Sequence, residues 1–372
     1  MSHPSFSSRV HHERISAILG IALGVAFGVC FVTGLLSHAA QTPIPWFPWP
    51  SRPAWLYRVT QGLHVFTGLA SIPLLLGKLW AVYPHLWRWP PVRSVAHAVE
   101  RAALVPLVGG SVFLLVTGVT NIDYWYPYQF FFRTAHYWAA WITIGALVVH
   151  IGATATVTAA ALRDREATAP STTTGLDRRH FLLAIAAAGG AVVLTTVGSA
   201  ITPLRQLAVL APRRPGIGPQ GLPVNHQARD GGVPDVHGDP SYRLRIRGRV
   251  ARPLELSLQE LRARPVHEVD LPISCVEGWS YSARWRGIRL RDLLDEAGAN
   301  PRSGVMVRSL QTRGPYSAAR VDAAHAHDPD TLLALGVNGA PLHLDHGFPL
   351  RLIAPNTPGV MQTKWITEVE SL

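Results

Sequence analysis

Hydrophobic residues along this chain follow two patterns, which change at about residue 201. Before that point they form five long apolar runs, at about 15–37, 62–82, 102–120, 137–161 and 181–201. Each run approaches or exceeds the roughly 20 residues that a helix needs to cross a bilayer. The first half therefore predicts a bundle of transmembrane helices, and five crossings place the two ends of the chain on opposite sides of the membrane.

The second half has the mixed pattern of a folded domain outside the bilayer. Residues 202–240 are rich in Pro and Gly and predict a tether with little helix or strand. Further on, "HEVDLPIS" is typical of a strand and "IRLRDLLDEAG" of a helix. The predicted division is a four-helix membrane domain at 1–163, an anchor helix at 164–201, the tether at 202–240 and a mixed α+β domain at 241–372.

Basic residues near the ends of the apolar runs predict the orientation. Ten lie on one side and three on the other; the ten are Arg9, Arg14, Lys78, Arg88, Arg93, Arg101, Arg163, Arg165, Arg178 and Arg179, and the three are Arg52, Arg58 and Arg133. Cytoplasmic loops carry the excess of Lys and Arg, so we expect a multi-pass plasma-membrane protein with a cytoplasmic N-terminus. The C-terminal domain is then extracytoplasmic, and the Trp- and Tyr-rich segments near residues 46–57 and 124–131 lie at the outer interface.

The net charge of +11 does not indicate a nucleic-acid partner. Residues 1–201 hold 13 basic and 6 acidic side chains, a balance of +7, and residues 202–372 hold 21 and 17, a balance of +4. Most of the excess thus follows the membrane orientation. No basic cluster interleaved with aromatic residues resembles a nucleic-acid surface.

Cys275 is the first candidate for chemistry, because the chain has only two cysteines and the other, Cys30, lies in an apolar run. We expect Cys275 on a loop between the predicted strand and helix, where side chains are displayed to ligands. Two interpretations are open on spacing alone: a metal ligand or nucleophile, or a buried inert thiol.

Four blocks of the second half resemble the molybdopterin-binding domain of the sulfite-oxidase superfamily in order and spacing. They are "YRLRIRGRVARPLELSLQEL", "ISCVEGWSYSARWRGIRLRDLLDEAGA", "TLLALGVNGAPLHLDHGFPLRLIAPNTPG" and "TKWITEVE". The resemblance implies an enzyme in which Cys275 is the single protein ligand to molybdenum and the pterin dithiolene supplies two more sulfurs. A soft thiolate suits such a metal.

The same resemblance implies a set of cofactor contacts. An anionic pterin phosphate needs cationic donors, and the matching positions are Arg351 and Lys364, with His346 either contacting the cofactor or holding its loop. Met361 stands where relatives carry a second basic residue, so other arginines are candidates. The remaining candidates are Arg284, Arg286 and Arg320 for the phosphate, Asn225 for the cofactor, and Trp279 and Tyr316 for the substrate pocket, with Tyr316 equally open as a core residue.

The wording "CVEGWS" is similar to the branch that contains bacterial methionine-sulfoxide reductase catalytic subunits. Animal and plant sulfite oxidases carry an arginine pair soon after the cysteine, whereas this chain has Gly278, Trp279 and Ser280 there. The resemblance therefore favours sulfoxide reduction over sulfite oxidation.

Histidines in or beside apolar runs are rare and usually functional. His64 and His136 open two runs that cross in the same direction, so they are expected at one depth, where they could bind one haem from either side. His150 lies 14 residues beyond His136, roughly 21 Å deeper on nearly the same helix face. The pattern resembles the four-helix b-type cytochromes of bacterial hydrogenases, which implies haem b at His64 and His136; a second haem at His150 and His12 is left open.

The segment "LDRRHFLLAIAAAGG" pairs Arg178 and Arg179 with a following apolar run and resembles a twin-arginine export signal. The positive-inside rule alone also accounts for the two arginines. We interpret the segment as an uncleaved signal anchor.

Together these features predict a membrane-anchored molybdopterin oxidoreductase that transfers an oxygen atom to or from a small substrate and exchanges electrons with a haem and a quinone pool. Two alternatives remain: a haem-free anchor that presents the domain to a soluble electron partner, and a binding module that has lost the metal. A domain of about 130 residues leaves little room for an appended dimerisation module, so a monomer is expected.

Overall fold

The computed structural model describes residues 9–42, 44, 46–86, 94–163, 178–197, 202–213, 216–236 and 239–372. They form two compact units. The helical unit takes in 1–35, 63–198 and 207–210, and the C-terminal unit takes in 36–62, 199–206 and 211–372. Arg88, Arg93 and Arg165, which the orientation prediction counts, lie outside the described residues, as do 164–177 and 198–201 of the predicted anchor and 214–215 and 237–238 of the predicted tether.

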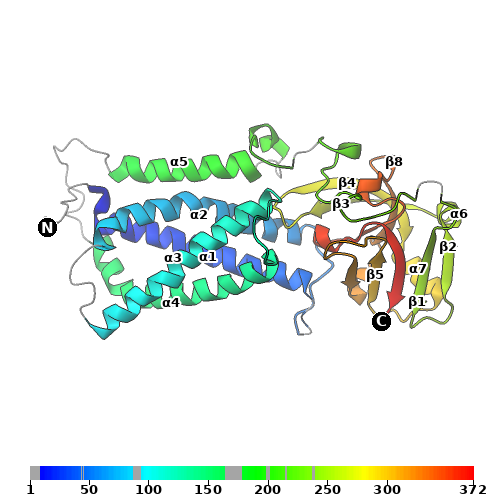
Figure 1. Cartoon of the computed structure of the whole chain (residues 1–372), viewed down its shortest axis with the longest axis horizontal. Helices are drawn as coiled ribbons and strands as arrows, with labels where there is room; N and C mark the ends of the chain where they lie inside the picture. Colours follow the sequence, from blue (N-terminus) through cyan, green and yellow to red (C-terminus); the bar gives the residue numbers. More distant parts are fainter. Residues whose placement is uncertain are drawn as a thin grey trace. The chain divides into compact units, whose positions relative to one another are not determined.

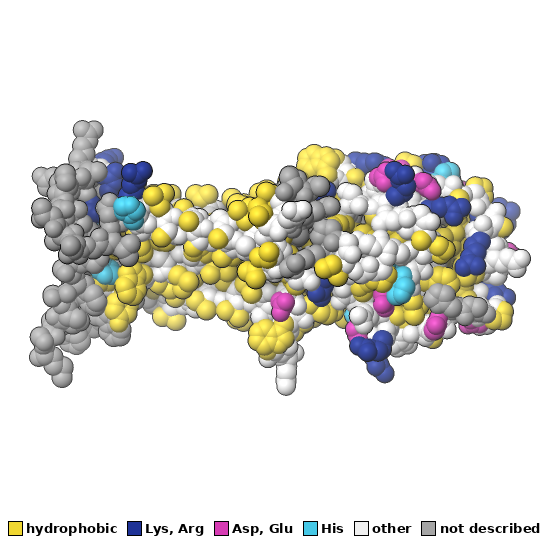
Figure 2. Space-filling model, turned by 90° about the horizontal axis from the view of Figure 1, so that it is seen from above, with side chains coloured by type: hydrophobic (Ala, Val, Ile, Leu, Met, Phe, Trp, Pro, Cys, Tyr) yellow, Lys and Arg dark blue, Asp and Glu magenta, His cyan; other side chains and the backbone are white. Residues whose placement is uncertain are grey.

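Five long helices occur where the apolar runs predict them (Figure 1). They are α1 (Glu13–Gln41), α2 (Leu56–Leu86), α3 (Val95–Ile122), α4 (Phe132–Arg163) and α5 (Arg178–Val197). Each is long and apolar enough to cross a membrane. Large apolar side chains such as Val105 and Val148 stay exposed on the helical unit, and apolar side chains cover the helices in Figure 2 with few charges among them.

The helices begin earlier than the apolar runs, which corrects the placement of two histidines. His64 lies two turns inside α2 and His136 one turn inside α4, so neither opens its helix. The reason is that "LYRVTQG" and "FRTA" extend the helices beyond the fully apolar stretch that sequence reasoning detects.

Small residues let the helices approach closely. A Cβ added at Gly77 of α2 would lie 2.2 Å from Cδ1 of Ile185 in α5, and one at Gly110 of α3 would lie 2.2 Å from Oγ1 of Thr143 in α4. Such contacts are typical of helices that pack in a membrane. Helix α5 consequently runs alongside α2, as Figure 1 shows.

The C-terminal unit contains two five-stranded sheets in its described residues. The first has the order β2-β1-β10-β5-β6, and in the second β3-β4-β7-β8 form a path with β9 paired to β7. The strands of the first sheet are β1 (Arg243–Gly248), β2 (Leu254–Ser257), β5 (Val305–Ser309), β6 (Ala318–Val321) and β10 (Ile366–Ser371); those of the second are β3 (His267–Ser274), β4 (Ser280–Arg289), β7 (Leu332–Val337), β8 (Ala340–Pro341) and β9 (Arg351–Ile353). Strands β1 and β10 are parallel, and the other pairs are antiparallel.

Short helices complete this unit. The α-helices are α6 (Leu258–Ala263), α7 (Leu290–Ala297) and α8 (Ala323–Ala326), and the 3₁₀ turns are η4 (Thr202–Leu207), η5 (Pro219–Gly221), η6 (Leu344–His346) and η7 (Gly359–Met361); η1 (Arg9–His11) belongs to the helical unit. Helix α7 ends at Gly298, whose φ of 71° is the left-handed conformation that glycine adopts without strain. The mixed α/β architecture predicted for the C-terminal half is confirmed.

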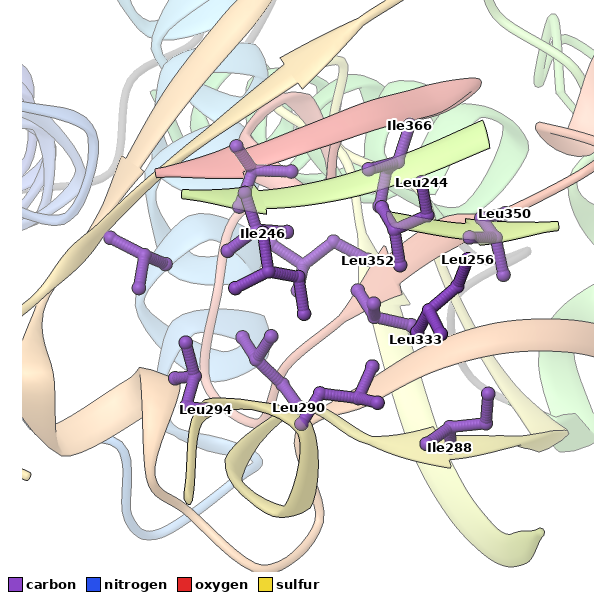
Figure 3. Packing of buried hydrophobic residues seen from close by; sticks show 14 of the residues in the cluster. Leu244, Ile246, Leu256, Ile288, Leu290, Leu294, Leu333, Leu350, Leu352 and Ile366 are labelled. Carbon is purple, nitrogen blue, oxygen red and sulfur yellow. The ribbon is translucent and has the colours of Figure 1, made fainter. Parts of the chain in front are cut away.

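One apolar core lies between α7 and the sheets (Figure 3). Leu244 and Ile246 of β1 point to the same side, because they are two residues apart, and they meet Leu290 and Leu294 of α7. Each fully buried leucine or isoleucine stabilises the fold by about 1.5 to 3 kcal/mol. A second core packs Trp285 and Leu332 around the strand ends that lead to Cys275.

The predicted tether and the domain boundary at 241 differ from the structure. Gln220 Nε2 donates to the carbonyl of Pro341 at 2.6 Å, and the Ala228 amide donates to Oδ1 of Asp345 at 2.8 Å. The segment from Pro219 onward is thus packed into the C-terminal unit. Its Pro and Gly residues prevent regular secondary structure, but the segment still packs against the rest of the unit.

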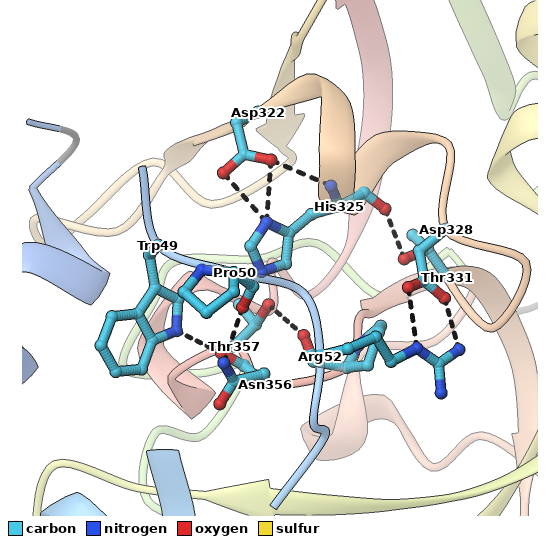
Figure 4. A network of polar contacts seen from close by, with 10 residues as sticks. Trp49, Pro50, Arg52, Asp322, His325, Asp328, Thr331, Asn356 and Thr357 are labelled. Atoms are coloured by element: carbon cyan, nitrogen blue, oxygen red, sulfur yellow. Dashed lines mark hydrogen bonds and ion pairs between the residues drawn. The ribbon is translucent and has the colours of Figure 1, made fainter. Parts of the chain in front are cut away.

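Residues between α1 and α2 also belong to the C-terminal unit (Figure 4). Trp49 Nε1 donates to the carbonyl of Asn356 at 2.8 Å, and the Asn356 side chain donates to the carbonyl of Pro50 at 2.6 Å. Arg52 donates to both carboxylate oxygens of Asp328, at 3.0 and 2.8 Å. This segment is therefore an integral part of the unit, although about 300 residues separate it from Asn356.

Candidate active site

Cys275 lies on the tight connection between β3 and β4, so the predicted strand-to-helix loop is wrong. Strand β4 follows the cysteine because "SYSARWRGIR" alternates buried and exposed side chains, and α7 comes only after it. The Cys275 amide donates to the carbonyl of Trp279 at 2.9 Å, and the Gly278 amide donates to the carbonyl of Cys275 at 3.1 Å. Gly278 has a φ of 92°, which closes the turn without strain only for glycine.

The Cys275 thiol is 1% exposed and faces the amide of Asn225, whose Nδ2 lies 3.5 Å from Sγ. Burial, with the nearby Glu277 carboxylate, raises the pKa of the thiol. Backbone N–H groups of Glu277 and Val276 and the Asn225 amide act in the opposite direction, because they donate to the sulfur. A buried sulfur with aligned donors is suited to a thiolate once a metal replaces the proton.

Glu277 is a site residue that the sequence analysis did not single out. Its side chain is buried, accepts a hydrogen bond of 2.8 Å from Trp279 Nε1 and lies 3.9 Å from Nε of Arg213. Burial raises the pKa of the carboxyl group. The sequence signal that could have identified Glu277 is its place two positions after the cysteine.

Arg351 is fully inside the unit on β9. Its Nη1 donates to the carbonyl of His346 at 3.2 Å, and its guanidinium carbon lies 5.4 Å from the centre of the Trp285 ring. Burial lowers the pKa of Arg351 to about 10, so it remains a cation at neutral pH. Its buried Nε has no hydrogen-bond partner among the described residues.

Lys364 is a second cation beside Arg351, and its residue is half-buried. Its Nζ donates to the carbonyls of His226 and Asp345, at 2.7 and 2.8 Å. Burial and then the Arg351 charge lower the pKa of Lys364 to about 7. Gly347 allows this approach, because a Cβ there would lie 3.1 Å from Cβ of Lys364 and 3.2 Å from Cβ of Arg351.

His346 is buried and connects η6 to the preceding segment. Its Nε2 donates to the carbonyl of Pro219 at 2.7 Å. Burial lowers the pKa of His346 to about 4, so the imidazole is neutral near pH 7. The structure therefore gives this histidine a loop-holding contact.

The other predicted residues lie at varied distances from the cysteine. Trp279 is buried in the cysteine loop, and Tyr316 is half-buried in the turn before β6. The phenol of Tyr57 on α2 is close enough to Cys275 and Tyr316 to interact electrostatically with both. The remaining arginines are placed differently: Arg320 and Arg286 are exposed on their strands, and Arg284 forms an exposed ion pair with Asp270.

The donor set around Cys275 fits a pterin-bound molybdenum. Arg351 and Lys364 supply positive charge for a phosphate. Three buried polar atoms have no hydrogen-bond partner among the described residues: Nε of Arg351 and, in the two residues before Lys364, Oε1 of Gln362 and Oγ1 of Thr363. Buried polar groups are normally satisfied, so these atoms are matched to a ligand with its own donors and acceptors.

In the helical unit, His64 and His136 face one another with ring centres 6.3 Å apart. His64 Nδ1 donates to the carbonyl of Cys30 at 2.8 Å. Thr117 donates its hydroxyl proton to the Phe113 carbonyl, so its oxygen accepts from His136 Nδ1 at 2.9 Å. Both Nε2 atoms are thereby left as acceptors.

This arrangement fits a haem iron between the two rings. Metal–imidazole bonds of about 2 Å place the centres of two opposed rings roughly 6 Å apart. Metal-binding histidines also donate their second nitrogen to a fixed acceptor. Gly34 keeps the space beside His64 open, because a Cβ there would lie 3.0 Å from Cε1 of that ring.

The second predicted histidine pair is not brought together by any contact of the described residues. Nδ1 of His150 is buried without a hydrogen-bond partner, whereas Nδ1 of His12 accepts from the Arg14 amide at 3.1 Å. Within the described part of the chain, no three His, Cys, Asp or Glu side chains gather as metal ligands.

Comparison with known proteins assigns the C-terminal domain. A family model described as the oxidoreductase molybdopterin binding domain matches residues 230–372. The uncharacterized oxidoreductase YuiH of Bacillus subtilis is 32% identical over 150 residues, which cover 40% of this chain and 73% of YuiH. This chain belongs to the sulfite oxidase family of molybdopterin-binding oxidoreductases. Residues 230–372 are its oxidoreductase molybdopterin binding domain.

Other relatives of this oxidoreductase match over a smaller part of their length. Mitochondrial sulfite oxidase of Rattus norvegicus is 34% identical over 164 residues, which cover 37% of this chain and 30% of the relative. The chain thus spans about a third of the sulfite oxidases that it matches. The sulfane dehydrogenase SoxCD of Paracoccus pantotrophus aligns with a TM-score of 0.33 and 23% identity over 42% of this chain and 43% of that one, a likeness too small to carry a conclusion.

Proposed function

We propose that this protein is a membrane-anchored, extracytoplasmic molybdopterin oxidoreductase that exchanges electrons with a haem in its own helical unit. The observation that carries the proposal is the cluster of buried Cys275 and Arg351 with half-buried Asn225 and Lys364. The histidine pair supports the haem, and the five apolar helices support the anchor.

Cys275 would hold the molybdenum, and Arg351 and Lys364 would hold the pterin phosphate. The metal, when bound, supplies the exchange of two electrons and one oxygen atom with the substrate. The protein's own residues fix the geometry: Asn225 directs an amide N–H at the sulfur, and Trp279 and Glu277 brace each other within the cysteine loop. Burial of Cys275, Glu277 and Trp279 keeps bulk water from the sulfur.

A neutral sulfoxide is the preferred substrate class, reduced with two electrons and two protons to a thioether and water. The stretch after the cysteine offers a buried carboxyl group at Glu277 and no arginine through Ser280. An anionic sulfite would find no cation in that stretch. Sulfite oxidation is the second candidate, because sulfite oxidases are among the relatives.

Electrons would pass between the molybdenum and a quinone pool through haem b held by His64 and His136. The excess of basic residues on the N-terminal side favours a cytoplasmic N-terminus, and the paired Arg178 and Arg179 at the start of α5 suit export of a folded domain. A monomer remains our expectation.

The test is metal analysis with reduced-minus-oxidised visible spectra on detergent-purified wild type, Cys275→Ser and His64→Ala. We expect about one molybdenum per chain, lost in Cys275→Ser, and a b-type haem band, lost in His64→Ala. Turnover of a sulfoxide with a quinol donor should require both residues. Wild type without molybdenum, from cells that make the cofactor, would leave only a membrane-anchored binding module.

A haem-free anchor that serves a soluble electron partner predicts a different result. In that case the His64→Ala variant would keep full turnover with electrons from a soluble donor. The wild type would show no haem band. Phe66→Ala, an exposed neighbour on α2, is the matched control for damage to the helix.

A further inference from the structure

Gln61, near the start of α2, contacts the cysteine loop directly. Its Nε2 donates to the carbonyl of Val276 at 3.0 Å, and the side chain is 6% exposed. Val276 is the residue after Cys275. A side chain from the first half of the chain therefore reaches the backbone beside the metal-binding sulfur, within the C-terminal unit.

Ser37 fixes the orientation of the Gln61 amide. Ser37 Oγ donates to Oε1 of Gln61 at 3.0 Å, so the oxygen of the amide is occupied and its NH₂ faces Val276. Gln41 Nε2 in turn donates to Ser37 Oγ at 3.1 Å. The polar chain Gln41, Ser37, Gln61 ends on the cysteine loop with each donor matched to an acceptor.

The carbonyl that Gln61 binds shares a peptide plane with the N–H of Glu277. That N–H donates to Cys275 Sγ. Because the peptide bond is planar and trans, its carbonyl and N–H point in opposite directions. Holding the oxygen of this plane therefore fixes the direction of the N–H that meets the sulfur.

We propose that Gln61 is a positioning residue: it fixes the peptide between Val276 and Glu277 and so aims an N–H group at the sulfur of Cys275. Hydrogen bonds to a ligating sulfur withdraw electron density and tune the metal's reduction potential. The inference rests on the proposed function, because the tuning needs molybdenum on Cys275. It places part of that tuning in α2, outside the region of family similarity.

The first test needs no cofactor. In a Cys30→Ser background Cys275 is the single cysteine, and its labelling by a maleimide in full-length, cofactor-free protein reports opening of the loop. We expect Gln61→Leu to accelerate labelling about tenfold, since the Val276 carbonyl loses a buried donor. Gln61→Glu keeps the acceptor for Ser37 but removes the donor, and should behave like Gln61→Leu.

Thr60→Val is the matched control. Thr60 is buried on the same helix, and its hydroxyl donates to the Tyr57 carbonyl within α2. Thermal unfolding of each variant shows whether the fold is kept. Equal acceleration in Thr60→Val, or wild-type labelling in both Gln61 variants, would overturn the inference.

The second test uses molybdenum-loaded protein. Gln61→Leu should move the molybdenum midpoint potential to more negative values and change the Mo(V) electron paramagnetic resonance spectrum, while Thr60→Val leaves both unchanged. Unchanged spectra in Gln61→Leu would overturn the tuning. If wild type binds no molybdenum, the proposed function fails, whereas faster labelling of Gln61→Leu would still support the placement of the loop by Gln61.

Discussion

At the residue level, Lys364 in the C-terminal unit is a lysine held by neutral groups. It donates to two backbone oxygens, and its Nζ lies 4.9 Å from the centre of the Trp365 ring. Within the described part of the chain it forms no ion pair, and burial lowers its pKa from 10.5 to about 7. A site of this kind is poised to take up a proton when an anion binds.

The cofactor-free protein should therefore become more stable as pH rises from about 7 to 10.5. In that window the unfolded chain keeps the proton of Lys364, whereas the folded domain has released it, so the free energy of unfolding increases with pH. The contribution is roughly 5 kcal/mol across the window and constant below pH 7. Thermal unfolding against pH should show this slope in wild type and lose it in Lys364→Met; parallel curves for the two proteins would contradict the assignment.

The family resemblance predicted those residues of the site that lie within the matching sequence blocks. Cys275 and Arg351, which are buried, come together with half-buried Lys364. Gln61 and Tyr57 could not be predicted, because they reach the cysteine loop from more than 200 residues away and carry no motif. Arg320 was a candidate by charge alone, and the alternation of β6 leaves it exposed.

At the scale of elements, the pairing of α3 with α4 places an acceptor beside His136 of the proposed haem site. The Thr117 oxygen of α3 accepts a hydrogen bond from Nδ1 of His136 of α4, because the Thr117 hydroxyl already donates its own proton to the Phe113 carbonyl.

Strand β4 could have been predicted from the sequence, because its buried and exposed side chains alternate with a period of two. The prediction instead placed Cys275 directly before the helix that follows this strand.

Replacing Thr117 with valine should weaken haem binding roughly tenfold, because a lost acceptor leaves the metal-binding ring less fixed and less basic. The haem midpoint potential should move to more positive values, which potentiometry on purified protein can measure. Ser111→Ala on the same helix is the control, since its hydroxyl donates to the Leu107 carbonyl within α3. Identical potentials in Thr117→Val and wild type would remove Thr117 from the haem site.

At the scale of the whole molecule, the apolar helices and the mixed α/β unit were both predictable, because each has a clear pattern of burial. The boundary between them was not, since the structure assigns residues 36–62 to the C-terminal unit. Contacts such as Trp49 with Asn356 depend on shape and backbone geometry that no local pattern records.

The proposed membrane orientation predicts which engineered cysteines react from outside the cell. In a Cys30→Ser, Cys275→Ser background, Ser241→Cys should be labelled by a membrane-impermeant maleimide on intact cells or spheroplasts. Ser94→Cys, equally exposed but before α3, should react only after lysis. The reverse pattern would mean that the chain has the opposite orientation. Labelling of both positions on intact cells would mean that they do not lie on opposite sides of the membrane.

The segment that holds Asn356 has a consequence for how the molecule is made. Translation delivers Trp49 and Arg52 about 300 residues before Asn356 and Asp328, the loop residues that they contact, so these side chains wait for the end of the chain. A fragment that starts at residue 202 would not fold into an autonomous enzyme, because Asn356 and Asp328 would lose their partners from residues 49–57. Supplying that short stretch as a separate peptide should restore the missing contacts. Folding of the C-terminal unit therefore depends on residues that are made in the first half of the chain.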